Sequence, residues 1–196
     1  VFWRKRFPRE LNGQRAMSMQ HASTRYGIDD ADASEVGVLA EVDRAASALF
    51  APTGLLSAEA LKDHVPIDIL ASAAENGDLF TARLDTGAPV GFALVSLRGG
   101  MLYLDQISVH PDQGQRGIGA ALLTRVIDEA KRRKLRRAAL STFRDLPWNA
   151  PFYAKHGFRE IRRSDMAEWM LELERIQAEE LDVSKRCFMV RKIGWL

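Results

Sequence analysis

The sequence predicts an α+β domain built on one mixed, mainly antiparallel sheet with helices on both faces. Strand-like apolar segments gather in the middle of the chain and are joined by short turn signals, which is typical of antiparallel hairpins. Helix-periodic segments precede these strands, and further helices alternate with strands toward the C-terminus. This order places helices on both faces of the sheet.

The composition is that of an ordinary globular protein. Of 196 residues, 46% are apolar and 28% are charged, which suits a single domain with a buried core. The longest apolar stretch, residues 88–97, is interrupted by Pro89 and Gly91 and is far shorter than the ~20 residues of a membrane span. Cys187 is the only cysteine, so an intramolecular disulfide is excluded and we expect a cytoplasmic protein.

The N-terminal residues 1–18 differ in charge from the rest of the chain. They carry five Lys and Arg residues against Glu10 alone, a net +4, whereas the whole chain carries +2 and its remainder therefore −2. The segment lacks the apolar core of a secretory signal. We interpret it as a disordered extension or a start assigned too early, with a basic interaction arm as the alternative, and we expect residues 19–196 to form one domain.

The first third of the chain predicts one strand and several helical segments. Leu39, Val42 and Ala46 show the three- and four-residue spacing of an amphipathic helix, and Pro52 and Gly54 end it. In order, we expect a strand over 24–28, a helix over 33–50, a second helical segment from 57 to before Pro66, and one or two helical turns over 67–75.

The remainder predicts three antiparallel strands followed by alternating helices and strands. Asp85-Thr86-Gly87-Ala88 is a hairpin signal, and Gly99-Gly100 turns the chain again. We expect strands over 78–84, 89–97, 101–109, 137–142, 158–162 and 186–193, and helices over 118–133, 149–155 and 165–180.

A glycine-bearing loop joins the strand that ends at Val109 to the helix that follows. The first N–H groups of a helix lack internal acceptors and lie at the positive end of its dipole. Gly117 and Gly119 let a phosphate approach this backbone, and Arg116 adds a charged hydrogen-bond donor. The loop therefore predicts a site for an anion such as a pyrophosphate.

Two other phosphate loops are excluded by sequence. A Walker loop requires Gly-Lys-Ser/Thr, but Ala120 and Ala121 follow Gly119. The dinucleotide fingerprint requires a third glycine three residues after its second, where this chain has Leu122.

The loop resembles motif A of the GNAT N-acetyltransferase superfamily, Gln/Arg-x-x-Gly-x-Gly/Ala, after a strand that ends in Val-x-Pro. Residues 113–120 read Gln-Gly-Gln-Arg-Gly-Ile-Gly-Ala, with Gly114 where the family has its first Gln or Arg. Residues 149–158, Asn-Ala-Pro-Phe-Tyr-Ala-Lys-His-Gly-Phe, resemble a second signature of the family, which contains an asparagine, a tyrosine and Gly-Phe. The resemblance extends over about residues 24–158.

The resemblance implies a fold in which two central strands splay apart and hold the pantetheine of acetyl-coenzyme A (acetyl-CoA) between them. It implies that Tyr153 is the general acid that protonates the departing thiolate, and that Asn149 contacts the cofactor. The implied cofactor contacts along the strand and loop are Ile107, Val109, Gln115, Arg116, Gly117, Ile118, Gly119 and Ala120, with Gln113 as a substitute phosphate contact.

Amine attack on a thioester requires a neutral amine, so a base must accept a proton. Asp105, on the strand that precedes the loop, occupies a place where family members often carry an acidic residue. His110 is the alternative base, and a surface or ion-paired carboxylate is the alternative role for Asp105. Around the acceptor, Phe50, Leu55, Leu56, His64 and Trp148 are candidates for the wall of the site or for plain core packing.

The basic run over 131–137 lies at the end of a helix and lacks interleaved aromatic residues, so a solvated face is favoured over a nucleic-acid site. No spacing of His, Cys, Asp and Glu indicates a metal site.

We expect an acetyl-CoA-dependent N-acetyltransferase acting on a primary amine of a small molecule or protein, without nucleic-acid or membrane partners. The alternative is a non-catalytic coenzyme A-binding regulatory module, and a homodimer stays open.

Overall fold

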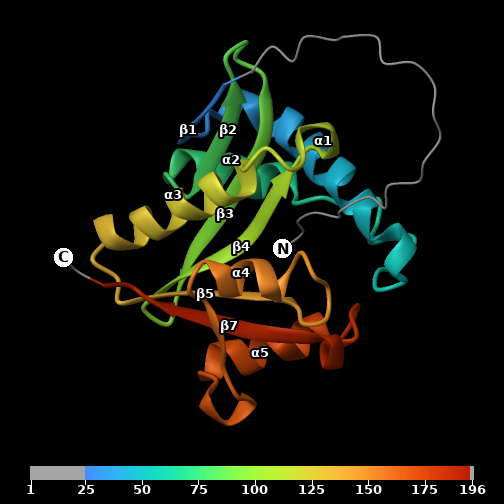
Figure 1. Ribbon diagram of the computed structural model, residues 1–196, viewed down its shortest axis with the longest axis vertical. Helices are drawn as coiled ribbons and strands as arrows, with labels where there is room; N and C mark the ends of the chain where they lie inside the picture. Colours follow the sequence, from blue (N-terminus) through green and yellow to red (C-terminus); the bar gives the residue numbers. More distant parts are fainter. Residues whose placement is uncertain (1–24, 195–196) are drawn as a thin grey trace.

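The computed structural model describes residues 25–194, which form one seven-stranded mixed sheet in the order β1-β2-β3-β4-β5-β7-β6 (Figure 1). The predicted α+β class is confirmed. The basic segment 1–18 lies outside the described residues. The strands are β1 (Tyr26–Asp30), β2 (Leu79–Leu84), β3 (Pro89–Arg98), β4 (Met101–Val109), β5 (Arg137–Phe143), β6 (Arg159–Glu160) and β7 (Arg186–Lys192). The α-helices are α1 (Val36–Ser47), α2 (Ile67–Glu75), α3 (Ile118–Arg132), α4 (Ala150–Lys155) and α5 (Glu168–Gln177).

The helical segment expected from Ser57 is wrong, because these residues form hydrogen-bonded turns instead. The Leu61 N–H donates to the Ser57 carbonyl at 3.0 Å, but residues 57–65 contain no α-helix. Two contacts tie the segment to α1. The Arg44 Nε donates to the Lys62 carbonyl at 3.2 Å, and the Val65 N–H donates to the Asp43 carboxylate at 2.9 Å.

Three other elements are shorter than expected. The helix expected over 33–50 is an α-helix only over 36–47, flanked by 3₁₀ turns that include Pro52. The strand expected over 158–162 pairs with β7 only through Arg159 and Glu160. The helix expected over 165–180 is restricted to 168–177.

The helices cover both faces of the sheet. The larger core contains Leu122 and Val126 of α3 and Tyr153 of α4, packed against one face of the strands. Leu39 of α1 and Leu70 of α2 pack against the N-terminal strands on the other face. Met170 of α5 joins Tyr103, Ala139 and Phe188 in a third cluster at the C-terminal strands.

The sheet divides between β4 and β5, its parallel pair. Their paired residues are only Leu102 to Leu104 with Ala138 to Leu140, although both strands continue beyond this point. Throughout its length, β5 pairs instead with β7. Figure 1 shows β5 and β7 crossing the direction of β3 and β4. The last five residues of β4, 105–109, therefore have no strand on the side of β5.

A β-bulge in β4 lies where this separation begins. Leu94 of β3 pairs with Gln106 and Val95 pairs with Leu104, so Asp105 is the extra residue. The bulge reverses the alternation of side chains. Leu104 and Ile107, three residues apart, therefore both pack in the larger core. The side chains of Asp105 and Gln106 line one cavity, next to the point where β4 and β5 separate.

The first three cations of the basic run, Lys131, Arg132 and Arg133 at the end of α3, are paired with carboxylates. Glu129 is fully buried and accepts hydrogen bonds from Arg125 at 2.8 Å, from Arg132 at 2.9 Å and from Arg133. The bond from Arg132 makes the largest contribution in lowering the pKa of Glu129 to about 2, against the opposing effect of burial. Lys131 pairs with Asp128 at 2.8 Å. These side chains fix the end of α3.

The Glu129 cluster predicts a pH-dependent loss of stability. Because the folded-state pKa lies below the ordinary value of 4.5, the stabilisation is present above pH 4.5 and is lost as the pH falls toward 2. We expect Glu129→Gln to lower the free energy of unfolding at pH 7 by about 2 kcal/mol, and by less at pH 3. Urea unfolding at both pH values measures this. Asp128→Asn, on the exposed side of the same helix, serves as control, and an equal loss in both variants would contradict the account.

Candidate active site

The edge of β4 that faces the separation presents unpaired backbone groups. The His110 N–H donates to the Val90 carbonyl of β3 at 2.8 Å, which sets the alternation along β4. Ser108 and Gln106 therefore direct their N–H and C=O groups toward β3, and Ile107 and Val109 direct theirs away from it. The side chains of Ile107 and Val109 are buried in the core, so this edge is rigidly held.

The loop after β4 places the N-terminus of α3 beside this edge. Gly117 caps the helix with a φ of 83°, a left-handed conformation that favours glycine. The first helical hydrogen bond runs from the Ala121 N–H to the Gly117 carbonyl at 3.0 Å, so the N–H groups of Ile118, Gly119 and Ala120 have no acceptor within the helix. Ile118 is buried and anchors the turn.

Polar side chains of the loop lie around this helix start. Gln115 is exposed and has a φ of 65°, which is unusual for a residue other than glycine. Arg116 donates a short hydrogen bond to the side chain of Gln113. Gln113 and Arg116 therefore form a pair next to Gly114, where the family pattern has a side chain and this chain has none.

A group of buried polar atoms without hydrogen-bond partners lies where β5 leads into α4. Asn149 is fully buried, and neither its amide nitrogen nor its amide oxygen has a partner. The same holds for the hydroxyl of Tyr153, the hydroxyl of Thr142 and the indole nitrogen of Trp148. Buried polar groups in folded proteins are nearly always hydrogen-bonded, so this concentration indicates a place where a ligand or water supplies the partners.

Tyr153 is held firmly in the core while its hydroxyl stays unpaired. Its ring packs edge-on against Phe152, with centroids 5.1 Å apart, and against Phe158 at 6.1 Å. Burial raises the pKa of Tyr153 well above its usual range because the charged phenolate would be poorly solvated. The hydroxyl therefore keeps its proton at neutral pH and can donate it in a hydrogen bond.

Asp105, the bulged residue, carries a carboxylate of which only one oxygen has a hydrogen-bond partner. Its Oδ1 accepts a hydrogen bond from Arg98 at 3.1 Å, whereas its buried Oδ2 has no partner. Burial raises the pKa of Asp105, and hydrogen bonds from Ser96 and Arg98 oppose this shift. A carboxylate of raised pKa is a stronger base, so the sequence-derived role for Asp105 is chemically reasonable.

Asp105 opens onto a cavity of about 370 Å³ on the α1 side of the sheet. Four carboxylates line it and no Lys or Arg does, among the described residues: Asp43, Asp63, Asp105 and Glu180. Leu56 and His64, which the family resemblance made candidates for the acceptor wall or for core packing, also line this cavity. Phe50 is buried against Phe143 of β5, with centroids 5.7 Å apart, and Leu55 lies in a separate cavity at the end of β5.

A buried network that sequence reasoning missed forms one wall of this cavity. Asp43 of α1 accepts hydrogen bonds from Gln106 at 2.7 Å and from Ser108 at 2.6 Å. Its second oxygen accepts from the Val65 N–H. The signal was available, because Asp43 follows Leu39 by four residues and so lies on the buried face of α1. The network fixes β4 to α1 at the separation.

His110, the alternative base, lies in the loop rather than in this cavity. Its Nδ1 accepts from the Asp112 N–H at 3.3 Å, and the residue caps the 3₁₀ turn that follows. Within residues 25–194 no cluster of three or more His, Cys, Asp or Glu could hold a metal ion. Over the same range no helix is long and apolar enough to span a membrane.

The chain is similar to known acetyltransferases. The model of the Acetyltransferase (GNAT) family matches residues 47–158, which is more than half of the chain. An N-acetyltransferase, PaiA, from Thermoplasma acidophilum in complex with coenzyme A has a TM-score of 0.62 at 18% identity. The alignment covers 86% of this chain and 99% of that one.

Two further solved structures share the fold. The ribosomal-protein-S18-alanine N-acetyltransferase from Escherichia coli has a TM-score of 0.58 at 18% identity, over 88% of this chain and 96% of that one. The N-acetylglutamate synthase from Neisseria gonorrhoeae, complexed with coenzyme A and N-acetyl-glutamate, has a TM-score of 0.62 at 18% identity, over 87% of this chain. The present chain spans 36% of that synthase.

Proposed function

The chain belongs to the GNAT acetyltransferase family, whose acyl donor is acetyl-CoA, and from this premise we propose that it transfers the acetyl group directly to a primary amine. The observation that carries the proposal is the separation of β4 and β5. It has an open backbone edge on one side and unpartnered buried polar groups on the other. We propose a cytoplasmic enzyme without metal, nucleic-acid or membrane partners.

The residues around the separation fit coenzyme A. The Ile107 and Val109 backbone groups would pair with the two amides of pantetheine as an added strand does. The N–H groups of Ile118, Gly119 and Ala120 would hold the pyrophosphate at the positive end of α3. Gln115, Arg116 and Gly117 would complete the phosphate site, with Gln113 positioning Arg116. Asn149 would regain hydrogen-bond partners for its buried amide.

Asp105 would act as the base. A protonated amine cannot attack a carbonyl carbon, so one N–H proton must leave first. The unpaired Oδ2 of Asp105 would accept it, directly or through one water, while Arg98 holds Oδ1. The neutral nitrogen then forms the new bond to the acetyl carbon.

Tyr153 would act as the acid. When the carbon–sulfur bond breaks, the electron pair and the negative charge move to sulfur. The hydroxyl of Tyr153 has no competing acceptor and keeps its proton at neutral pH, so it would donate that proton to the sulfur. The proton still carried by the attacking nitrogen would return to the Tyr153 phenolate, directly or through water, so the products are a free thiol and a neutral amide.

The cavity beside Asp105 favours a cationic acceptor. Four carboxylates and no described Lys or Arg line it, so its field attracts an ammonium group and disfavours an anion. We propose a primary amine that carries a second positive charge, in a small molecule or at the end of a flexible protein side chain. Leu56 and Val65 give the cavity an apolar wall for the carbon chain between the two charges.

The alternative is a module that binds coenzyme A without catalysis. Such a module has no use for an unpaired phenol or for a half-satisfied carboxylate at the separation. Both groups cost folding free energy while they lack partners, which favours the catalytic proposal.

Turnover across a panel of amines tests the proposal. We expect free thiol release from acetyl-CoA to depend on the added amine, with diamines and lysine-containing peptides faster than amines that carry a carboxylate. Free thiol is measured with a chromogenic thiol reagent, and the acetylated amine is identified by mass spectrometry. Tight binding of coenzyme A together with no amine-dependent thiol release would contradict catalysis and support the regulatory module. Turnover restricted to carboxylate-bearing amines would contradict only the acceptor class.

The Tyr153→Phe variant tests the acid. Because the hydroxyl interacts with sulfur mainly after the carbon–sulfur bond begins to break, kcat should fall by about 10² or more while acetyl-CoA affinity changes little. Thermal stability should be unchanged or slightly higher, since the variant removes a buried hydroxyl that has no partner. Steady-state kinetics and calorimetry separate the two effects. A wild-type kcat, with the chemical step shown to limit turnover, would assign Tyr153 to packing alone.

A further inference from the structure

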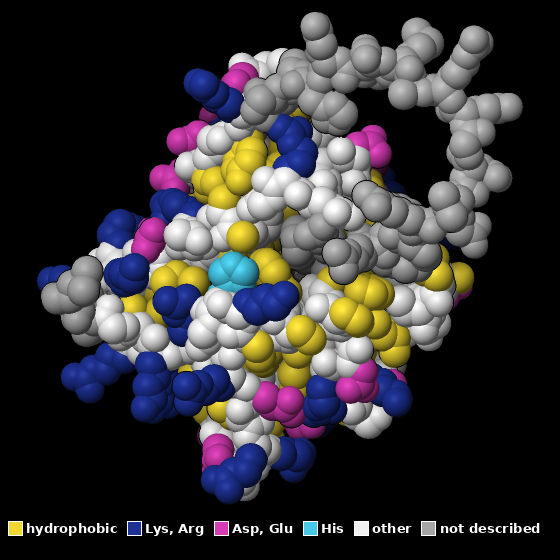
Figure 2. Space-filling model, viewed as in Figure 1, with side chains coloured by type: hydrophobic (Ala, Val, Ile, Leu, Met, Phe, Trp, Pro, Cys, Tyr) yellow, Lys and Arg dark blue, Asp and Glu magenta, His cyan; other side chains and the backbone are white. Residues whose placement is uncertain are grey.

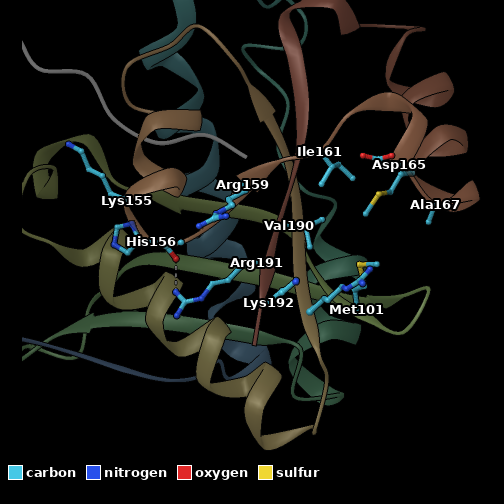
Figure 3. A pocket seen from close by; sticks show the side chains of 13 residues that line it. Met101, Lys155, His156, Arg159, Ile161, Asp165, Ala167, Val190, Arg191 and Lys192 are labelled. Carbon is cyan, nitrogen blue, oxygen red and sulfur yellow. Dashed lines mark hydrogen bonds between the residues drawn. The ribbon is translucent and has the colours of Figure 1, made fainter. Parts of the chain in front are cut away.

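A cavity away from the candidate active site lies around the outer edge of β7. It has a volume of about 990 Å³ and is bordered by the end of α4, by β6 and by the start of α5. Figure 3 shows Lys155, His156 and Arg191 on one side of this edge and Ile161 and Ala167 on the other. We call it the β7 groove.

The β7 groove is strongly basic. Five cationic side chains line it, against Asp165 as the one acidic residue among its described lining: Arg137, Lys155, Arg159, Arg191 and Lys192. Asp165 is itself paired with Arg162 at 2.9 Å. Figure 2 shows lysine and arginine side chains gathered on this part of the surface, around the end of β7.

The cations of the β7 groove lack counter-charges among the described residues, unlike Lys131, Arg132 and Arg133 at the end of α3. None of the five forms an ion pair with a carboxylate of residues 25–194, whereas Lys131, Arg132 and Arg133 are all paired. Within the described residues, Arg191 alone of the five donates a side-chain hydrogen bond, to the carbonyl of His156 (Figure 3). Like charges that line one cavity repel one another, so a partner that supplies negative charge would stabilise the groove.

The apolar residues of the groove indicate what kind of anion would bind there. Its floor contains apolar side chains from β4, α5, β7 and the connection after β6, and no Phe, Tyr or Trp among the described residues: Met101, Met170, Val190 and Ile161. Single-stranded nucleic acid is generally held by aromatic rings on which its bases stack. An aliphatic floor with a cationic rim is complementary to a peptide that combines aliphatic and acidic side chains.

The edge of β7 also offers a backbone contact. The Ile193 N–H donates to Arg136 on the β5 side at 2.9 Å, and the Phe188 carbonyl accepts from Ile161 on the β6 side at 3.1 Å. Successive residues of a strand direct their backbone groups to opposite sides, so the N–H and C=O of Lys192 point away from β5. Because β6 pairs no further than Val190, these groups face the groove rather than a strand.

From these contacts we propose that the β7 groove binds an acidic, aliphatic peptide segment of a protein partner. Acidic side chains of the segment pair with Lys155, Arg159 and Lys192, and an aliphatic side chain fills the floor over Val190. The backbone of the segment hydrogen-bonds to Lys192. This interaction goes beyond the proposed acetyl transfer, because the groove shares no lining residue with the cavity at Asp105.

Fluorescence anisotropy of the full chain with a labelled twelve-residue peptide of Glu, Asp, Leu and Ser tests the groove. We expect saturable binding that weakens with salt, and a loss of about tenfold or more in affinity in the double variant Lys155→Glu, Arg159→Glu. Lys62→Glu, Lys185→Glu makes the same change in net charge at exposed lysines outside the groove, and its affinity should stay within about twofold of wild type. Thermal unfolding checks each fold, and Lys155→Gln, Arg159→Gln replaces the first variant if it unfolds.

Two comparison ligands decide the chemistry of the partner. The same peptide with Ser in place of Leu should bind more weakly, and a twelve-nucleotide single-stranded RNA should bind less tightly than the acidic peptide. Equal loss in the groove and control variants would overturn the groove as a site, because binding would then follow net charge alone. Tighter binding of RNA than of peptide, lost in the groove variant, would assign the groove to nucleic acid instead.

Discussion

The early end of hydrogen bonding between β4 and β5 is the constraint on which the rest of the structure depends. Beyond Leu104 and Leu140 the two strands separate, and each is held by its other neighbour, β3 or β7. A strand edge inside a protein must have its backbone groups satisfied, or folding free energy is lost. The separation is therefore stable when something other than a strand supplies partners to Ile107 and Val109, and pantetheine, a chain with two amides, has the chemistry to do so.

The bulge at Asp105 connects this opening to the chemistry. Without the extra residue, Gln106 rather than Ile107 would enter the core, and the polar face of β4 would point toward α3. With it, the core continues through Ile107 and Val109 while Asp105 reaches the cavity that we propose for the acceptor. Asp43 of α1 stabilises this arrangement by binding Gln106 and Ser108. Tyr153 lies on the opposite face, so the proposed base and acid approach the reacting atoms from two sides of the sheet.

The sequence was sufficient to predict the fold class, the strand order along the chain and the glycine loop, because those depend on local periodicity and on residues such as Gly117. It predicted a helix after Ser57 that does not form. There the Lys62 carbonyl accepts a hydrogen bond from Arg44 and the Val65 N–H donates one to Asp43, and these tertiary contacts override a weak helical preference. The bulge is indicated in the sequence by the spacing of Leu104 and Ile107, because apolar residues three apart do not fit the two-residue period of a regular strand. The β7 groove could not be predicted, because Arg137, Lys155 and Lys192 converge only through pairing of distant strands.

The central claim is that the β4 edge and the α3 N-terminus together receive coenzyme A, and amide hydrogen exchange tests it most directly. At a coenzyme A concentration that saturates binding by calorimetry, the amides of Ile107 and Val109 and of residues 118–120 should exchange more slowly than in the free protein. The Ser108 amide, which faces β3, should change little and serves as the internal control. Saturated binding with unchanged exchange at Ile107, Val109 and residues 118–120 would contradict the account.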